Sequence, residues 1–165
     1  MRRQVLLEEV NQLRQAIHET YNLAKKKPYI TVIIVNKRIT QRFFVEDNQG
    51  RMINPPSGAL IDQKIVENQD MLSEYDFYLV PQFTSQGCVL PTHFYVPFND
   101  SPVEKSVIEK LTFDLCHYYY NWAGAIKVPA PCMYAHKIAE LFMNLGKDAR
   151  GIEFGDRIAQ SLHFL

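Results

Sequence analysis

A histidine near the start of a predicted helix is the residue best placed for chemistry in this sequence. It lies in the stretch VPAPCMYAHK at 128–137, where two prolines predict an extended lead-in and a helical pattern begins at once. His136 would stand on the first turns of that helix, which suits an imidazole presented at the mouth of an α/β sheet. The alternative is a structural histidine that caps or packs near a helix start. A neutral imidazole nitrogen is also a common metal ligand.

Two carboxylates could join His136 at a metal ion. Glu140 follows it by four residues, so both side chains could reach one ion from a single helix face, although such a pair more often makes a surface contact. Asp62 follows a turn that contains Gly58, and its alternative role is in a turn or a helix cap. The residue types alone therefore leave open a metal site formed only by residues of this chain.

Basic and aromatic side chains form two further groups that could contact nucleic acid. Lys37, Arg38 and Arg42 follow a predicted strand, at the end of the sheet where α/β proteins place ligands. They could bind phosphates, or they could form a solvated basic turn. The aromatic run at 118–120 and Trp122 could stack on bases, but core packing late in an amphipathic helix is the more common role.

Length and composition predict one globular domain with no global attraction to polyanions. The chain has 165 residues, 47% of them hydrophobic and 22% charged, and its formal net charge is zero. Any contact with RNA must therefore come from local basic clusters. Cys88, Cys116 and Cys132 lie in apolar stretches and are expected to be reduced core thiols. Together with the lack of a signal peptide or membrane span, they predict a soluble cytoplasmic or nuclear protein that is not secreted.

The periodicity of apolar residues predicts helices and strands in an α/β order. A first helix with apolar positions from Leu6 to Ala24 ends at the lysines of 25–27 and Pro28. The segment 29–35 is apolar on both faces, which predicts a central strand covered on both sides. Further elements are expected as strands at 43–45, 76–80 and 92–98, a polar loop at 46–57, and helices at 131–145 and 156–162.

One more helix is predicted between the last strand and the helix that carries His136. Ser101 and Glu104 form a capping box with Pro102 at the first helical position. The apolar stripe of this helix is expected to consist of Val107, Leu111, Leu115 and Tyr118. Strands packed between helices indicate an α/β layer fold.

Several motifs in register resemble one known family. They are VNKRITQRFF at 35–44, NPPSGALID at 54–62, DFYLV at 76–80, QGCVLPTHFYV at 86–96, LTFDLCHYYYNW at 111–122 and the VPAPCMYAHK segment. Together they resemble the PIWI domain of Argonaute proteins, and the YYNW and PAPC details look closer to the Piwi branch. The resemblance implies an RNase H-like fold in which a small, piRNA-like guide RNA directs cleavage of a complementary target RNA.

The resemblance also implies a catalytic site with two aspartates, a glutamate and a histidine around Mg²⁺ or Mn²⁺. His136 takes the histidine position, as a catalytic residue and a metal ligand. The three carboxylates would precede Met1, so residues 1–165 are expected to be the C-terminal half of a PIWI domain. The upstream half and the MID, PAZ and N domains would then be missing. This half-domain would not cleave RNA alone, and whether to count it as an enzyme stays open.

Further positions are expected to contact RNA by the same resemblance. Lys37, Arg38 and Arg42 correspond to a region that contacts the guide or target backbone, and Gln86 and Lys127 correspond to guide-backbone contacts. The carboxylate of Leu165 would enter the pocket for the guide's 5′ phosphate, help to hold a cation there, and meet the MID domain. The expected partners are guide RNA, target RNA and the missing half-domain, with no membrane.

Two rival functions remain open from the sequence. The first is a stand-alone metal-dependent ribonuclease that recruits Asp62 or Glu140 beside His136. The second is a protein-interaction module without an RNA role, which would use an unpaired strand edge.

Overall fold

The structure is a computed structural model that describes residues 2–21, 28–62 and 75–145. The order of helices and strands confirms the expected α/β class. The elements are α1 (Arg2–Tyr21), β1 (Thr31–Asn36), β2 (Val45–Glu46), β3 (Met52–Ile53), β4 (Leu60–Asp62), β5 (Tyr75–Leu79), β6 (Thr92–Asn99), α2 (Lys105–Leu115) and α3 (Ala130–Leu145). None of the helices in these ranges combines the length and the apolar character needed to cross a bilayer.

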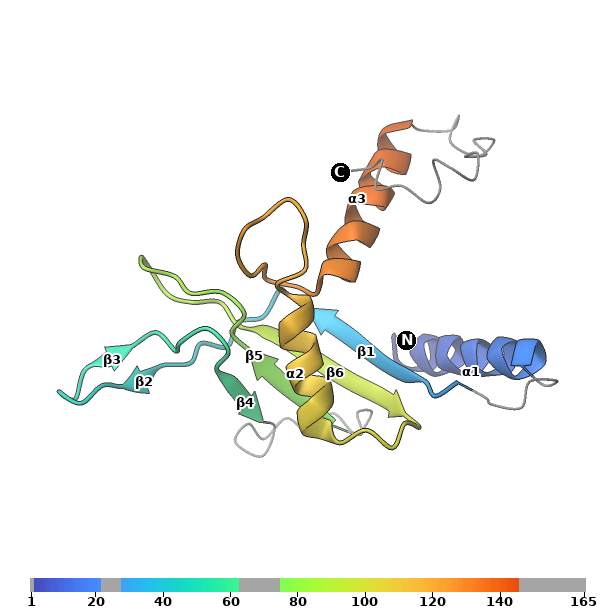
Figure 1. Cartoon of the computed structure of the whole chain (residues 1–165), viewed down its shortest axis with the longest axis horizontal. Coiled ribbons are helices and arrows are strands. Elements are labelled where there is room, and N and C mark those ends of the chain that lie inside the picture. Colours follow the sequence, from blue (N-terminus) through green and yellow to red (C-terminus); the bar gives the residue numbers. More distant parts are fainter. Residues whose placement is uncertain (1, 22–27, 63–74, 146–165) are drawn as a thin grey trace.

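Four strands form an antiparallel sheet in the order β1-β6-β5-β4. One row of residues crosses all four strands, since Phe94 pairs with both Val35 and Phe77, and Phe77 pairs with Asp62. β2 and β3 form a separate two-stranded hairpin that projects from the end of the sheet, and α3 points away from the sheet (Figure 1). The sheet is therefore the platform from which these parts extend.

The hydrophobic core lies between the sheet and α2, which crosses one face of it (Figure 1). Phe77, Leu79, Phe94 and Val96 are buried there, with Phe113 of α2 packed against them. The rings of Phe77 and Phe94 stack at a centroid distance of 5.1 Å. Burying each such side chain contributes about 1.5–3 kcal/mol.

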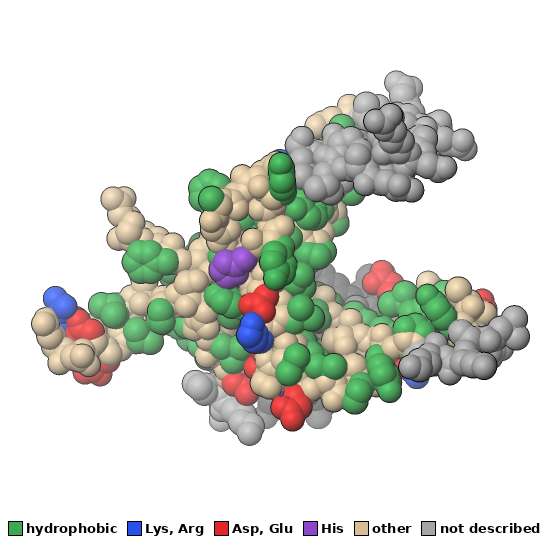
Figure 2. Space-filling model, viewed as in Figure 1, with side chains coloured by type: hydrophobic (Ala, Val, Ile, Leu, Met, Phe, Trp, Pro, Cys, Tyr) green, Lys and Arg blue, Asp and Glu red, His purple; other side chains and the backbone are tan. Residues whose placement is uncertain are grey.

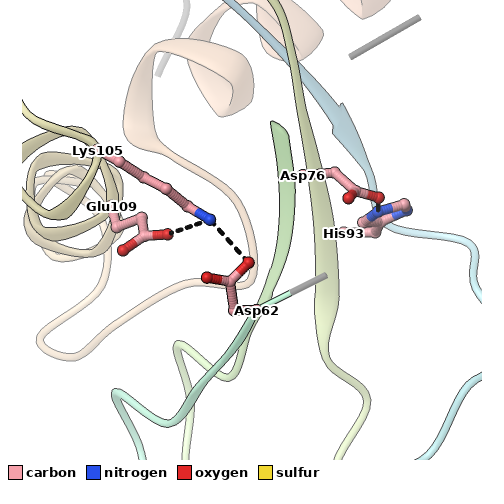
Figure 3. Close-up of polar contacts among 5 residues, drawn as sticks. All are labelled: Asp62, Asp76, His93, Lys105 and Glu109. Carbon is pink, nitrogen blue, oxygen red and sulfur yellow. Dashed lines mark hydrogen bonds and ion pairs between the residues drawn. The ribbon is translucent and has the colours of Figure 1, made fainter. Parts of the chain in front are cut away.

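A buried polar pair occupies the other face of the sheet, because successive strand residues point to opposite faces. The imidazole Nε2 of His93 on β6 donates to Oδ2 of Asp76 on β5 at 2.6 Å (Figure 3). The ring of Tyr78 stacks on His93 at 4.1 Å, and Phe43 meets Tyr78 edge-on at 5.1 Å. Both members of the pair are almost fully buried. This pair was not predicted from the sequence.

The prediction that the first strand is central is wrong for the described sheet. β1 lies at its edge, and all six of its residues are half-buried. A two-sided apolar pattern indicates that both faces are partly covered, but it does not encode which strands pair. β3 and β4 were not predicted because two or three residues are too few to show a period.

The predicted start and stripe of α2 are also wrong. The helix begins at Lys105, and the hydroxyl and N–H of Ser101 instead bond to the side chain of Asn99 at 2.6 and 3.1 Å. Ile108 and Thr112 are buried, whereas Val107 and Leu111 are exposed. The predicted and the buried faces of the helix both carry apolar residues, and their positions are offset by one residue along the sequence. The apolar pattern alone therefore did not identify the buried face. The C-terminal residues of the predicted first helix and the helix at 156–162 lie outside the described residues.

Candidate functional site

His136 lies on the second turn of α3 and contacts the end of β1. Its Nε2 atom is 3.0 Å from Nζ of Lys37, and both side chains are exposed. An ammonium group only donates hydrogen bonds, so Nε2 accepts and the proton of a neutral ring is on Nδ1. The long-range contact joins two residues that the sequence analysis had proposed separately.

The loop after β1 is held by its own side chains. Oδ1 of Asn36 accepts the backbone N–H of Arg38 at 3.2 Å. Nη1 of Arg42 donates to three consecutive backbone carbonyls, those of residues 39–41, at 2.8–3.3 Å. Part of the Arg42 guanidinium therefore shapes the loop. The Arg38 side chain is exposed and makes no hydrogen bond or ion pair with another described residue.

Lys127 approaches this loop from the segment before α3. The hydroxyl of Thr92 donates to the Lys127 carbonyl at 2.8 Å, which fixes the segment to β6. Burial lowers the pKa of the Lys127 ammonium, and the nearby charges of Arg42 and Lys37 lower it further. We call Lys37, Arg42 and Lys127 the basic cluster. No described carboxylate forms an ion pair with any of the three.

A pocket of about 280 Å³ lies beside the Lys37–His136 contact, between β1 and α3. Its apolar walls include Ile33, Val35 and Val128, and Cys132 also lines it. Burial raises the pKa of the Cys132 thiol, and burial raises that of Cys116 to about 12. Both thiols are thus protonated at neutral pH.

Gln86 lies in the exposed loop between β5 and β6, next to Gly87, whose φ of 73° favours glycine. The side chain of Asn54 holds this loop, because its Nδ2 donates to the Gly87 carbonyl at 2.7 Å and its Oδ1 accepts from the Val89 N–H at 3.0 Å. Asn54 was not singled out in the sequence, where its proline neighbours indicated only a loop. Cys88 is exposed on the loop, so the prediction of a core thiol is wrong there.

Asp62 does not join His136, and its predicted role in a turn or a helix cap stays a prediction, because the residues that follow it lie outside the described residues. It ends β4, and its Oδ1 accepts from Nζ of Lys105 at 2.7 Å (Figure 3). Asp62 and Val35 stand at opposite edges of the four-stranded sheet. Three strand spacings separate them by about 14 Å.

Glu140, the other candidate carboxylate, is exposed on α3. Its Oε2 lies 3.9 Å from Nζ of Lys137. In the part of the chain that the structure describes, no three His, Cys, Asp or Glu side chains gather where they could hold an ion. His136 therefore belongs to no such group of ligands there, and Leu165 lies outside the described residues.

The aromatic run after α2 is not core, contrary to the prediction. Tyr118, Tyr120 and Trp122 are exposed, because α2 ends at Leu115 and helical spacing no longer applies beyond it. The hydroxyl of Tyr134 on α3 accepts from the Tyr120 N–H at 3.0 Å, which ties this loop to α3.

Comparison with known proteins identifies what the chain is similar to. The Piwi domain family matches residues 1–147. Piwi-like protein 1 of Gallus gallus is 45% identical over 114 residues, which are 69% of this chain and 13% of that protein. Piwi-like protein 1 of Schmidtea mediterranea is 35% identical over 94% of this chain and 19% of its own length. The chain thus spans less than a fifth of these relatives.

Solved structures give the same relationship. The crystal structure of Drosophila Piwi matches with a TM-score of 0.79 and 32% identity, over 98% of this chain and 21% of that one. The structure of Kluyveromyces polysporus Argonaute with a guide RNA matches with a TM-score of 0.69 over 95% of this chain and 20% of that one. At 16% identity, the second match supports the fold alone.

Proposed function

The chain belongs to the Piwi domain family, and we propose that it binds the phosphate backbone of a small guide RNA through the basic cluster. The observation that carries this proposal is the gathering of Lys37, Arg42 and Lys127 without a paired carboxylate among the described residues. Three cations that repel one another favour a bound polyanion, because its phosphates relieve the repulsion.

Arg38 and Gln86 are proposed to add contacts at the edge of this surface, and both are exposed. Arg38 follows Lys37 in the chain, and Gln86 lies in the loop whose residues Thr84 and Cys88 line a pocket together with Lys127. A complementary target RNA is the proposed second strand. Lysine and arginine contacts to phosphates supply affinity without reading sequence. Because the net charge of the chain is zero, the affinity should be weak and should depend strongly on salt.

Replacement of both Lys37 and Lys127 by alanine is the first test of this proposal. We expect the affinity for a 12-nucleotide single-stranded RNA to fall on the order of 10- to 100-fold at low salt, as two charge-assisted contacts are lost. The slope of log affinity against log salt should become shallower by about 1.4, at about 0.7 per phosphate contact. Fluorescence anisotropy over a salt series measures both.

The matched control replaces two lysines outside the cluster, the exposed Lys110 and the half-buried Lys137, each of which lies beside a carboxylate on its own helix. This double variant has the same net charge as the first one. An equal loss of affinity in both variants would contradict a role for the basic cluster and would indicate a response to overall charge.

We also propose that His136 is the histidine of the RNA-cleaving site of a complete PIWI domain, which would use Mg²⁺ or Mn²⁺. The described residues do not fit such an ion by themselves. They offer one imidazole nitrogen, whereas these ions bind mainly to several oxygen ligands. The carboxylates must therefore come from outside the described residues, and the role of the Leu165 carboxylate stays a prediction.

The 165-residue chain is expected not to cleave RNA when it is incubated alone with Mg²⁺ or Mn²⁺. The measurement is gel analysis of a 5′-labelled RNA, with His136→Ala run in parallel and a buffer blank. Product should stay at the level of the blank for both proteins. Cleavage by the wild-type chain that His136→Ala abolishes would instead establish a stand-alone metal-dependent ribonuclease.

A further inference from the structure

An exposed apolar groove lies between the β2–β3 hairpin and the loop at 81–90. It has a volume of about 520 Å³, and Phe44, Met52, Ile53, Phe83, Thr84 and Cys88 contribute to its walls. We call it the hairpin groove. Figure 2 shows hydrophobic side chains gathered on this projecting end of the molecule. Nothing in the basic cluster or at His136 accounts for this groove.

Two phenylalanine rings are the most exposed aromatic features of the hairpin groove. Phe44 is 49% exposed and Phe83 is 69% exposed, and they come from separate segments on either side of it. Leaving large apolar rings in water is unfavourable, and a cluster of them marks a binding surface. Their flat faces suit a planar ligand.

The hairpin groove is continuous with the surface that carries the basic cluster. A second pocket, of about 220 Å³, shares Thr84 and Cys88 with the groove and is also lined by Lys127. A nucleotide carries its charge on one side and its flat apolar surface on the other. A strand whose phosphate contacts Lys127 can therefore direct a neighbouring base toward the phenylalanines.

We propose that the hairpin groove stacks an unpaired base of the single-stranded RNA whose backbone the basic cluster holds. This inference rests on the proposed function. Asn54 also lines the groove, but its side-chain amide already bonds to the Gly87 carbonyl and the Val89 N–H. Because that amide is committed to the loop, the groove stacks bases of any sequence rather than reading their edges.

The choice of RNA over an apolar protein segment follows from charge. The groove opens beside Lys127, whose ammonium already has a lowered pKa because of burial and of the charges of Arg42 and Lys37. A polyanion relieves that repulsion, whereas an uncharged peptide leaves it in place. The basic cluster and the groove therefore complement the two sides of one nucleotide.

The test compares the full chain's affinity for a 12-nucleotide RNA and for an abasic strand with the same number of phosphates. Wild-type protein is expected to bind the base-containing RNA about 10-fold more tightly. Phe83→Ala and Phe44→Ala should each remove most of that preference and leave binding of the abasic strand unchanged. Phe83→Trp should retain it, since tryptophan still offers a stacking face.

Tyr29→Ala is the matched control, because Tyr29 is an aromatic residue that is 68% exposed, compared with 69% for Phe83, and it lies before β1. It should leave both affinities unchanged, and thermal melting should show that all variants fold. As a second readout, a 2-aminopurine base in the RNA should lose fluorescence on binding wild-type protein but not Phe83→Ala.

Two other outcomes would contradict the stacking site, and they can be told apart. Equal affinity for the two strands, or an effect of Phe83→Ala no larger than that of Tyr29→Ala, would assign the groove to something else, such as a protein partner. If the protein in that case still binds RNA with the expected dependence on salt, the proposed function is retained and only the stacking site is rejected. Failure to bind either strand at low salt overturns the proposed function and the stacking site together.

Discussion

Asp76→Ala is expected to lower the free energy of unfolding by about 3 kcal/mol, the upper end of the cost of leaving a buried polar group without its hydrogen-bond partner. His93 would then keep its buried Nε2–H with no acceptor, because Asp76 Oδ2 at 2.6 Å is the acceptor that it has. The stacked ring of Tyr78 at 4.1 Å offers no replacement. Urea denaturation followed by circular dichroism measures the loss.

A double-mutant cycle separates the pair from its surroundings. His93→Phe keeps a flat ring against Tyr78 but leaves the buried Asp76 side chain without its hydrogen-bond donor. It should therefore lower the free energy of unfolding by a similar amount. Combining it with Asp76→Leu should recover most of the stability, because two apolar side chains leave no buried polar atom unpaired.

The matched control is Asp114→Ala, which removes an ion pair with Lys110 of the same 2.6 Å length on the exposed side of α2. It should change stability by less than about 1 kcal/mol. Should Asp76→Ala cost no more than this control, the pair would have to be reached by water.

The sequence predicted the buried strands 76–80 and 92–98 correctly, yet it did not predict the Asp76–His93 pair. The signal was present, since a charged residue inside an apolar strand requires a partner. Which partner it finds depends on the β5–β6 register, and one residue of slip would turn His93 to the opposite face. No single strand contains that information.

The same reasoning explains the partial prediction of the candidate site. The helix that carries His136 was correct because its proline lead-in and apolar period are local features. The contact between His136 and Lys37 spans 99 positions, and it depends on how α3 leaves the end of the sheet. The hairpin groove was missed because its walls come from three short segments that show no period of their own.

Phe94→Ala is expected to destabilise the chain by about 3–5 kcal/mol, which is comparable to the loss for Asp76→Ala and arises from a cavity rather than a stranded polar group. Phe94 is fully buried, stacks on Phe77 at 5.1 Å, and pairs with Val35, two residues before Lys37. The lost packing therefore lies beside β1, the strand that leads to Lys37.

Phe83→Ala supplies the control for this last substitution, because it deletes the same ring where it is 69% exposed. It should change stability by no more than about 0.5 kcal/mol. The two variants are expected to have opposite effects on the folded fraction and on the preference for base-containing RNA. Phe94→Ala should lower the folded fraction and leave the base preference of the folded protein intact. Phe83→Ala should leave the folded fraction unchanged and remove most of the base preference. If Phe83→Ala also unfolds the chain, its ring belongs to the core, and the groove is not a binding surface.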